Sequence, residues 1–274
     1  MQTPRSILLH LDTSSRCAER VKLAAQLAQR FDAEVTAMLC TMPALMRFPY
    51  AMESTAEAVT LMQDLDQECR DKAHAVFVEA GAGSPRLHWA EQISDAPWGF
   101  ARRALYADLM ILGQRNVDDA SAGELPPDFL PSLLVESGKP ALVLPYAGPI
   151  AQIGRTVLVA WKETPESARA LSASLPWLCG ADRVHVVCYD HDPAAALAAV
   201  RDYLAVAGVP ATTTHAGGPD RGEAGNSLLS LAADLGADLL VMGCYGHSRA
   251  REWVLGGVTR SILQSMTLPV LMSH

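Results

Sequence analysis

Aromatic residues and positive charge are both scarce in this 274-residue sequence. Only 6% of the residues are aromatic, and 22 Lys and Arg residues stand against 30 Asp and Glu, for a formal net charge of −8. A protein that binds nucleic acid through its overall charge is basic, and one that stacks bases needs exposed aromatic rings. The composition therefore disfavours nucleic acid as a partner.

Long apolar runs and clustered cysteines are missing as well. No apolar run approaches the roughly 18 residues that span a bilayer, and the first residues lack the pattern of a signal peptide. The six cysteines lie far apart, without a CxxC pair or a Cys/His cluster at zinc spacing. We therefore expect a cytoplasmic protein with unpaired thiols, no membrane association and no metal site built from its own side chains.

Three segments of the first half recur in the same order in the second half. The similar pairs are 5–12 with 155–162, 107–113 with 237–243, and 139–145 with 268–273. Self-similarity of this kind indicates a tandem repeat of one folding unit. The segment 148–154 is rich in glycine, proline and small residues and suits a linker. We therefore predict two domains, 1–148 and 154–274.

Short apolar runs alternate with helical patterns in both halves. The apolar runs predict strands at 6–12, 34–41, 86–91, 108–113, 140–145, 156–161, 183–189, 210–215, 238–243 and 269–273. Helices are predicted at 15–31, 55–80, 95–106, 127–137, 165–178, 192–207, 221–235 and 257–266. Thr13, Ser14 or Ser15 is expected to cap the first helix. The segment 42–54 is predicted to be a loop.

The predicted strands are apolar at nearly every position. Segment 238–243 is an example, and such runs are typical of parallel strands that helices cover on both faces. With the right-handed crossover rule, the alternation predicts an α/β fold: two tandem doubly wound domains, each with a five-stranded parallel sheet. Ligands of such sheets bind beyond the carboxyl ends of the strands, so the residues after the first and fourth strands are the candidates.

A glycine-rich segment follows the fourth strand of the second half. Gly243 and Gly246 come directly after the strand, and Gly256 and Gly257 precede the next helix. Glycine lets the backbone approach a ligand closely, and free amides at a helix start attract anions. Together with the hydroxyl of Thr259, this segment favours a phosphate site. The alternative is that the four glycines only make tight turns.

The spacing G-x2-G-x9-G, followed by a small residue and Val-Thr, resembles the signature of the universal stress protein family. Segment 157–171 and the ending Leu-Pro-Val-Leu-Met resemble the opening strand and helix and the final strand of that family, and the resemblance covers the chain as a tandem of two domains. It implies a Rossmann-like α/β sandwich and, in many members, binding of ATP or another adenine nucleotide. The implied site comprises Gly243, Gly246, Gly256, Gly257, Val258 and Thr259 around phosphates and ribose, and Ala160, Trp161, Lys162 and Val187 around the base. Inside the loop, His247 and Ser248 are either phosphate donors or exposed turn residues.

The second half departs from the family pattern at three positions. Gly257 stands where a serine or threonine is common, which removes a hydroxyl but keeps the backbone amide. Lys162 replaces the acidic residue of ATP-binding relatives and is either a phosphate contact or a solvated side chain. Trp161 is bulkier than the usual valine and is expected to narrow the base pocket.

The first half shows the reverse combination. Asp12 occupies the acidic position after the first strand, but no second and third glycine follow Gly113 at the required spacing. Asp118, Asp119 and Glu124 instead bring negative charge to the place where a phosphate would lie. We therefore expect no nucleotide in this half, with Asp12 acting as a helix cap or turn residue.

The sequence carries no nucleophile elbow, HExxH motif or Walker A lysine, so a dedicated enzyme is not expected. The leading hypothesis is a regulatory, stress-associated tandem protein that binds an adenine nucleotide in its second half, with magnesium entering only with the phosphates. The alternatives are an interaction protein whose two sites have both decayed, and a slow ATP hydrolase. We expect the two domains to pair through their last strands, and two chains could associate further as a homodimer.

Two cysteines and one loop have alternative interpretations. Cys17, in the first turn of a helix, and Cys244, inside the glycine loop, are either packing residues or redox-responsive thiols. The Met-, Phe- and Tyr-containing segment 42–54 is expected to cover the neighbouring domain or a protein partner.

Overall fold

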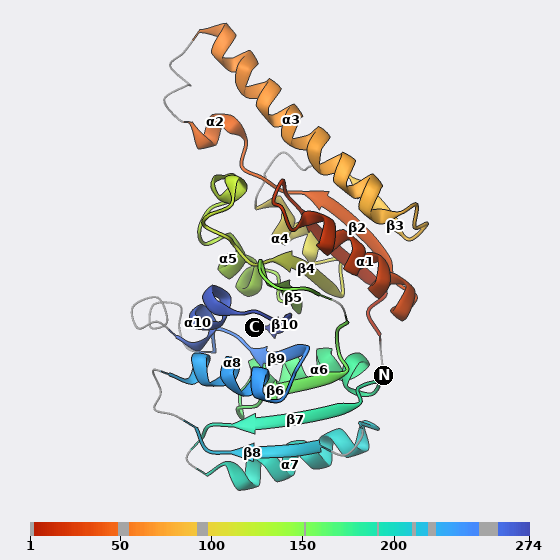
Figure 1. The fold of residues 1–274 in the computed structure, drawn as a ribbon, viewed down its shortest axis with the longest axis vertical. Helices are drawn as coiled ribbons and strands as arrows, with labels where there is room; N and C mark the ends of the chain where they lie inside the picture. Colours follow the sequence, from red (N-terminus) through yellow and green to blue (C-terminus); the bar gives the residue numbers. More distant parts are fainter. Residues whose placement is uncertain are drawn as a thin grey trace. The chain divides into compact units, whose positions relative to one another are not determined.

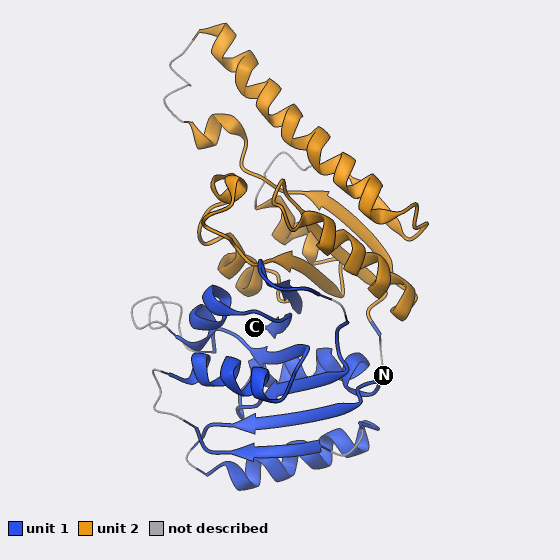
Figure 2. Ribbon diagram, in the orientation of Figure 1, with its two compact units in different colours: residues 1–3, 140–274 blue, residues 4–139 orange. Residues whose placement is uncertain are grey.

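The computed structural model describes residues 3–48, 55–91, 98–150, 152–190, 192–209, 212–218, 223–246 and 257–274. The chain forms two compact units, which Figure 2 shows in different colours. Residues 4–139 make the N-terminal unit, and residues 1–3 with 140–274 make the C-terminal unit.

The N-terminal unit is built on four parallel strands in the order β3-β2-β1-β4. These strands are β1 (Ser6–Leu11), β2 (Glu34–Leu39), β3 (Leu87–Ala90) and β4 (Leu109–Gly113). The helices are α1 (Cys17–Phe31), α2 (Ala44–Arg47), α3 (Ala56–Gly81), α4 (Gly99–Ala104) and α5 (Phe129–Glu136), with a 3-10 helix η2 (Ala120–Glu124). Apolar residues of β1 and β4 are buried throughout, as parallel strands between helices require.

The C-terminal unit has six strands in the order β5-β10-β9-β6-β7-β8. Its strands are β5 (Ala141–Leu144), β6 (Thr156–Ala160), β7 (Arg183–Cys188), β8 (Thr212–Ala216), β9 (Leu239–Gly243) and β10 (Val270–Ser273). Its helices are α6 (Pro165–Leu178), α7 (Pro193–Val206), α8 (Ala224–Asp234) and α10 (Val258–Ser265) (Figure 1). The pairing is parallel except between β5 and β10, which run antiparallel.

The pairing of β5 with β10 joins the last strands of the two sequence halves, as expected. Val143 lies opposite Val270, and Leu142 opposite Leu271. Because of this pairing, the compact units divide at residues 139 and 140, ahead of the linker at 148–154. The predicted boundaries, 1–148 and 154–274, follow the similarity between the two halves of the sequence. The compact units follow the contacts in the folded chain, which place β5 with the C-terminal strands.

The helix that follows the first strand begins differently in the two halves. In α6, Thr164 accepts a hydrogen bond from the Ser167 amide at 3.4 Å, and Pro165 occupies the first helical position. The predicted cap of the other helix is wrong, because α1 begins at Cys17 behind Arg16 and has no side-chain cap. The three expected capping residues make other hydrogen bonds. The Ser14 carbonyl accepts from the Cys17 amide, and the hydroxyl groups of Thr13 and Ser15 donate to distant carboxylates.

Two short helices were not predicted. Within the expected loop 42–54, residues 44–47 form α2, and Asp66 of α3 accepts a hydrogen bond from the Ala44 amide at 2.8 Å. Residues 49–54 lie outside the described part of the chain. The second is η2, where the side chain of Asp119 accepts from the Ser121 amide. Both elements are held by carboxylates that local apolar periodicity does not reveal.

Helix α3 extends well beyond the sheet of its unit (Figure 1). Only Ala73, Ala80 and Gly81 of its 26 residues are buried. No helix in the described part of the chain is long and apolar enough to cross a membrane. The cytoplasmic location stays a prediction.

Candidate functional site

A cleft of about 370 Å³ opens in the C-terminal unit at the carboxyl ends of β6, β7 and β9. Eight of the residues predicted from sequence line it: Ala160, Trp161, Lys162, Val187, Gly243, Gly246, Val258 and Thr259. Gly257 is the residue that precedes the first turn of α10. His247, Ser248 and Gly256 lie outside the described residues. The structure therefore brings together segments that are more than 80 positions apart in the chain.

Several lining residues were missed by the sequence analysis. They are Thr164, Glu166 and Ser167 at the start of α6, Tyr189 and Asp190 after β7, Ala224 and Leu228 of α8, Met242 of β9, and Tyr245. Tyr245 lies in the segment Gly243–Gly246, which we call the glycine bend. The rule that parallel strands end at one edge of the sheet could have identified those after β7. The residues of α6 and α8 need knowledge of how the helices pack over that edge.

The first glycine of the bend is required by close packing against α6. A β-carbon on Gly243 would lie 2.6 Å from the Ser167 amide nitrogen and 2.7 Å from the Glu166 carbonyl carbon. Both are backbone atoms that cannot move aside without shifting the helix. This glycine therefore has a structural reason that is independent of any ligand.

Part of the bend is already hydrogen-bonded within the chain. The Cys244 amide donates to the Ser273 carbonyl at 2.9 Å, and the Tyr245 amide donates to the Thr259 hydroxyl oxygen at 3.4 Å. Tyr245 adopts a left-handed conformation with φ of 55°, which L-residues seldom do. The first bond holds the bend against the end of β10, and the second holds it against the first turn of α10.

The start of α10 offers backbone donors to the cleft. Gly257 has no side chain to cap this helix, and Val258 and Thr259 line the cleft. The first amides of a helix have no partner within the helix and carry a partial positive charge. An anionic group in the cleft would therefore be stabilised at this end.

Ionisable groups at the cleft nevertheless include more negative than positive charge. Among the described lining residues, Glu166 and Asp190 are carboxylates and Lys162 is the single cation. Burial raises the pKa of Glu166, but hydrogen bonds from its own amide and Thr164, with the charge of Arg169, outweigh this and leave the pKa below its ordinary value. Glu166 is therefore ionised at neutral pH.

Trp161 contributes an unsatisfied donor to the same cleft. Its indole Nε1 is buried and has no hydrogen-bond acceptor among the described residues. Leaving a buried donor unpaired costs about 1–3 kcal/mol. An acceptor atom on a ligand would remove this cost.

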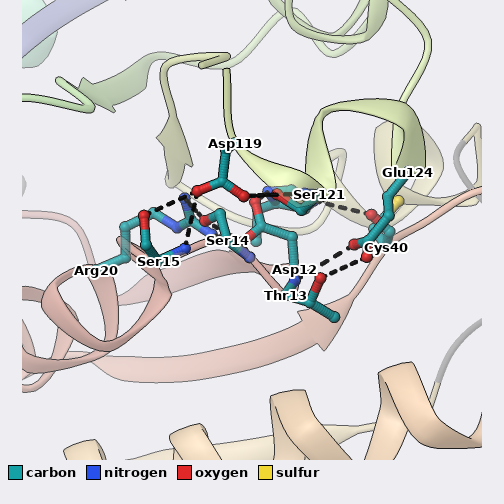
Figure 3. Close-up of polar contacts among 10 residues, drawn as sticks. Asp12, Thr13, Ser14, Ser15, Arg20, Cys40, Asp119, Ser121 and Glu124 are labelled. Atoms are coloured by element: carbon teal, nitrogen blue, oxygen red, sulfur yellow. Dashed lines mark hydrogen bonds and ion pairs between the residues drawn. The ribbon is translucent and has the colours of Figure 1, made fainter. Parts of the chain in front are cut away.

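The corresponding strand ends of the N-terminal unit carry a cluster of polar side chains that contact one another (Figure 3). Arg20 of α1 forms a buried ion pair with Asp12, and a β-carbon on Gly113 would collide with its guanidinium group. Asp12 also accepts from the Ser14 amide at 3.0 Å, so of its two expected roles, helix cap or turn residue, the structure shows the turn residue. Burial raises the pKa of Asp12, but the charge of Arg20 outweighs this and lowers it.

The segment after β4 supplies two more carboxylates to this cluster (Figure 3). Asp119 accepts from the Ser15 hydroxyl at 2.8 Å, and hydrogen bonds from Ser121 lower the pKa of Asp119 to about 2. Glu124 accepts from the hydroxyl and amide of Thr13. Hence Asp119 and Glu124 lie where the sequence suggested, but they bind the β1–α1 turn, while Asp118 does not join them.

Neither thiol singled out from the sequence has a feature of a reactive cysteine. Cys17 is buried, and its burial raises the pKa of the thiol, opposite to the lowering expected at a helix start. Cys244 is buried and is not among the residues that line the cleft. The packing interpretation fits both residues better.

Taken together, the fold and the site define an α/β protein with a cleft of ligand size at the strand ends of its C-terminal unit. The family model described as the Universal stress protein family matches residues 154–274. This match spans less than half of the chain, and it makes residues 154–274 similar to the universal stress protein family.

Solved structures extend the likeness in fold to the whole chain. A universal stress protein from Archaeoglobus fulgidus covers 99% of this chain and 96% of its own, with a TM-score of 0.71 and 16% identity. A putative universal stress protein from Pseudomonas aeruginosa covers 99% of this chain and 94% of its own, with a TM-score of 0.61 and 17% identity. Among curated proteins, universal stress protein Slr1230 from Synechocystis is 40% identical over 50 residues, which is 18% of this chain and 17% of that relative.

Proposed function

We propose that the C-terminal cleft binds an adenine nucleotide and that the chain is a regulatory, stress-associated binding protein. The observation that carries this proposal is the convergence of the glycine bend, the uncapped start of α10 and the end of β6 on one cleft of about 370 Å³. These are the segments that the family resemblance assigns to a nucleotide. Beside Gly113, in contrast, the Arg20 guanidinium group occupies the place where a β-carbon would lie.

The lining of the cleft suits a base at one end. Trp161 and Tyr189 provide aromatic surface, and Val187, Leu228 and Met242 provide apolar surface. The unpaired Trp161 Nε1 calls for an acceptor, which a purine ring nitrogen or a ribose oxygen can supply. Sites of this kind combine an apolar lining with a few placed polar groups.

The end of the cleft proposed for the phosphates has backbone amides and, among the described lining residues, one cation. The first amides of α10 and the ammonium group of Lys162 border the cleft. Among the described residues, no three His, Cys, Asp or Glu side chains gather as a metal site. A magnesium ion would therefore be held chiefly by the phosphates of the ligand.

Calorimetric titration of the full chain with adenosine, AMP and ATP tests this proposal. Ala224→Trp places an indole in the cleft, and Ala195→Trp places one on the exposed face of α7 as the matched control. We expect saturable binding to the parent and the control, and at least tenfold weaker binding to the cleft variant. Absence of binding by all three ligands up to millimolar concentration would remove the proposal.

An interaction protein without a small ligand is the second candidate. The two carboxylates at the cleft favour it, because they oppose an anionic ligand. It predicts that neither adenosine nor its nucleotides bind, and that the Ala224→Trp chain keeps its partner. The titration therefore separates the two candidates.

A further inference from the structure

Glu166 lies over the glycine bend of the C-terminal cleft. A β-carbon on Gly246 would lie 2.9 Å from the Glu166 Oε2 atom and 3.4 Å from its Cδ. The carboxylate thus borders the bend on the side that faces the cleft, since both residues line it. A phosphate bound against the Gly246 backbone on this side would therefore lie close to the carboxylate.

The charge of Glu166 is only partly compensated. Its side chain is 14% exposed, and among the described residues it forms an ion pair with Arg169, which lies 3.3 Å from Oε1 and is 47% exposed. Arg169 also donates through Nε to the His274 carbonyl at 2.6 Å, so its guanidinium group is shared. The carboxylate therefore retains negative charge toward the cleft.

The charges at the cleft limit how much anion it can accept. Lys162 and the first turn of α10 can stabilise one phosphate group, whereas Glu166 and Asp190 repel further negative charge. Partial burial weakens solvent screening of the repulsion from Glu166. The unfavourable electrostatic contribution to the binding free energy should therefore rise with each phosphate added to the ligand.

We propose that Glu166 is a specificity-determining residue that keeps polyphosphate out of the glycine bend, so that the cleft takes a nucleoside monophosphate in preference to a triphosphate. This inference rests on the proposed function, because it concerns the same cleft and the same base. Glu166 acts by its own charge on the ligand, without a change in the fold. The effect should therefore follow the charge of the residue and not its size.

The test compares the parent chain with Glu166→Gln, which keeps the shape of the side chain and removes the charge. Glu163→Gln is the matched control, because this exposed carboxylate lies three residues earlier and is not among the lining residues. Each chain is titrated with adenosine, AMP, ATP in the presence of a chelator, and ATP with magnesium. Thermal unfolding of each variant establishes that it is folded.

We expect the parent and Glu163→Gln to bind AMP at least about tenfold more tightly than chelator-treated ATP. In Glu166→Gln the affinity for ATP should rise by about tenfold or more, while that for adenosine stays unchanged. An unchanged ratio of AMP to ATP affinity in Glu166→Gln overturns the inference, even where adenosine binding leaves the proposed function intact. Weaker adenosine binding by Glu166→Gln would show that Glu166 contacts the base or ribose. Weaker binding of magnesium-ATP alone would show that it contacts the metal ion. Either result would contradict the inference that Glu166 keeps polyphosphate out of the bend. Failure of all ligands to bind any of the three chains removes the proposed function as well.

Discussion

Arg20 and Glu166 occupy related places at the residue scale. Each belongs to the helix that follows the first strand of its half, and each sets a charged group against a glycine after a central strand. Arg20 is neutralised by Asp12 inside the N-terminal unit, whereas Glu166 faces a cleft. The charge set against the glycine is thus paired in the N-terminal unit and borders a cleft in the C-terminal unit.

His10 makes the stability of the N-terminal unit depend on pH. Its ring is buried between Phe100 and Phe129, and its Nε2 lies 3.0 Å from the Cys40 carbonyl oxygen. Burial lowers the pKa of His10 to about 4, although the charge of Asp12 opposes this. The unfolded chain, with a pKa near 6.5, binds a proton more readily than the folded chain in this range.

We therefore expect the free energy of unfolding to fall by about 3 kcal/mol from this residue as the pH drops from 7 to 4. His10→Gln keeps a donor for the carbonyl but does not titrate, so this part of the pH dependence should vanish. Urea unfolding at several pH values measures it, with His88→Gln, an exposed histidine, as the control. An identical pH profile for parent and His10→Gln would contradict the assignment. The lowered pKa of Asp12 adds a separate loss only below its unfolded value of about 3.8.

At the element scale, helix starts shape the cleft. The first turn of α6 contributes Thr164, Glu166 and Ser167 to the lining, and its start is defined by the Thr164 cap. In contrast, Thr55 precedes α3 in an extended conformation without a side-chain cap. A threonine therefore contributes more to the free energy of unfolding before α6 than before α3.

Thr164→Ala should lower the free energy of unfolding by about 1 kcal/mol, because the Ser167 amide loses its acceptor. Thr55→Ala should change it by less than about 0.5 kcal/mol. Denaturant unfolding of the two variants beside the parent makes the comparison. A loss of equal size in both would show that the cap at α6 has no special contribution.

At the scale of the whole molecule, β5 belongs to one repeat by sequence and to the other by packing. It covers the edge of β10, whose residues Val270, Leu271 and Met272 are fully buried. An apolar strand edge without such a cover is a site of self-association. The duplication therefore protects an edge that one repeat alone leaves open.

A fragment of residues 149–274 should self-associate, because it lacks β5 and exposes β10. A fragment of residues 140–274 keeps that strand and should self-associate less strongly at the same concentration. Size-exclusion chromatography with light scattering distinguishes them. Monomers of equal stability from both fragments would show that β5 does not protect β10.

The order and type of the main helices and strands could be predicted from local sequence patterns. Helix α6 runs from Pro165 to Leu178 as predicted, and β9 starts within one residue of its prediction, because apolar periodicity, caps and glycines act over short distances. The location of the candidate site also followed from sequence, since parallel strands end at one edge of the sheet. The starts of α1 and α2 could not be predicted this way, because partners remote in sequence set them.

Two features could be seen only in the folded chain. They are the charged side chains that lie against the glycines at the strand ends, and the pairing of β5 with the edge of β10. Arg20 reaches Gly113 across 93 positions of the chain, and Glu166 reaches Gly246 across 80. Such contacts depend on the direction of a side chain from a packed helix, and no local pattern encodes that direction. The charge and shape of the groups at the strand ends of each unit are therefore products of packing, whereas the framework that carries them is a product of short-range sequence pattern.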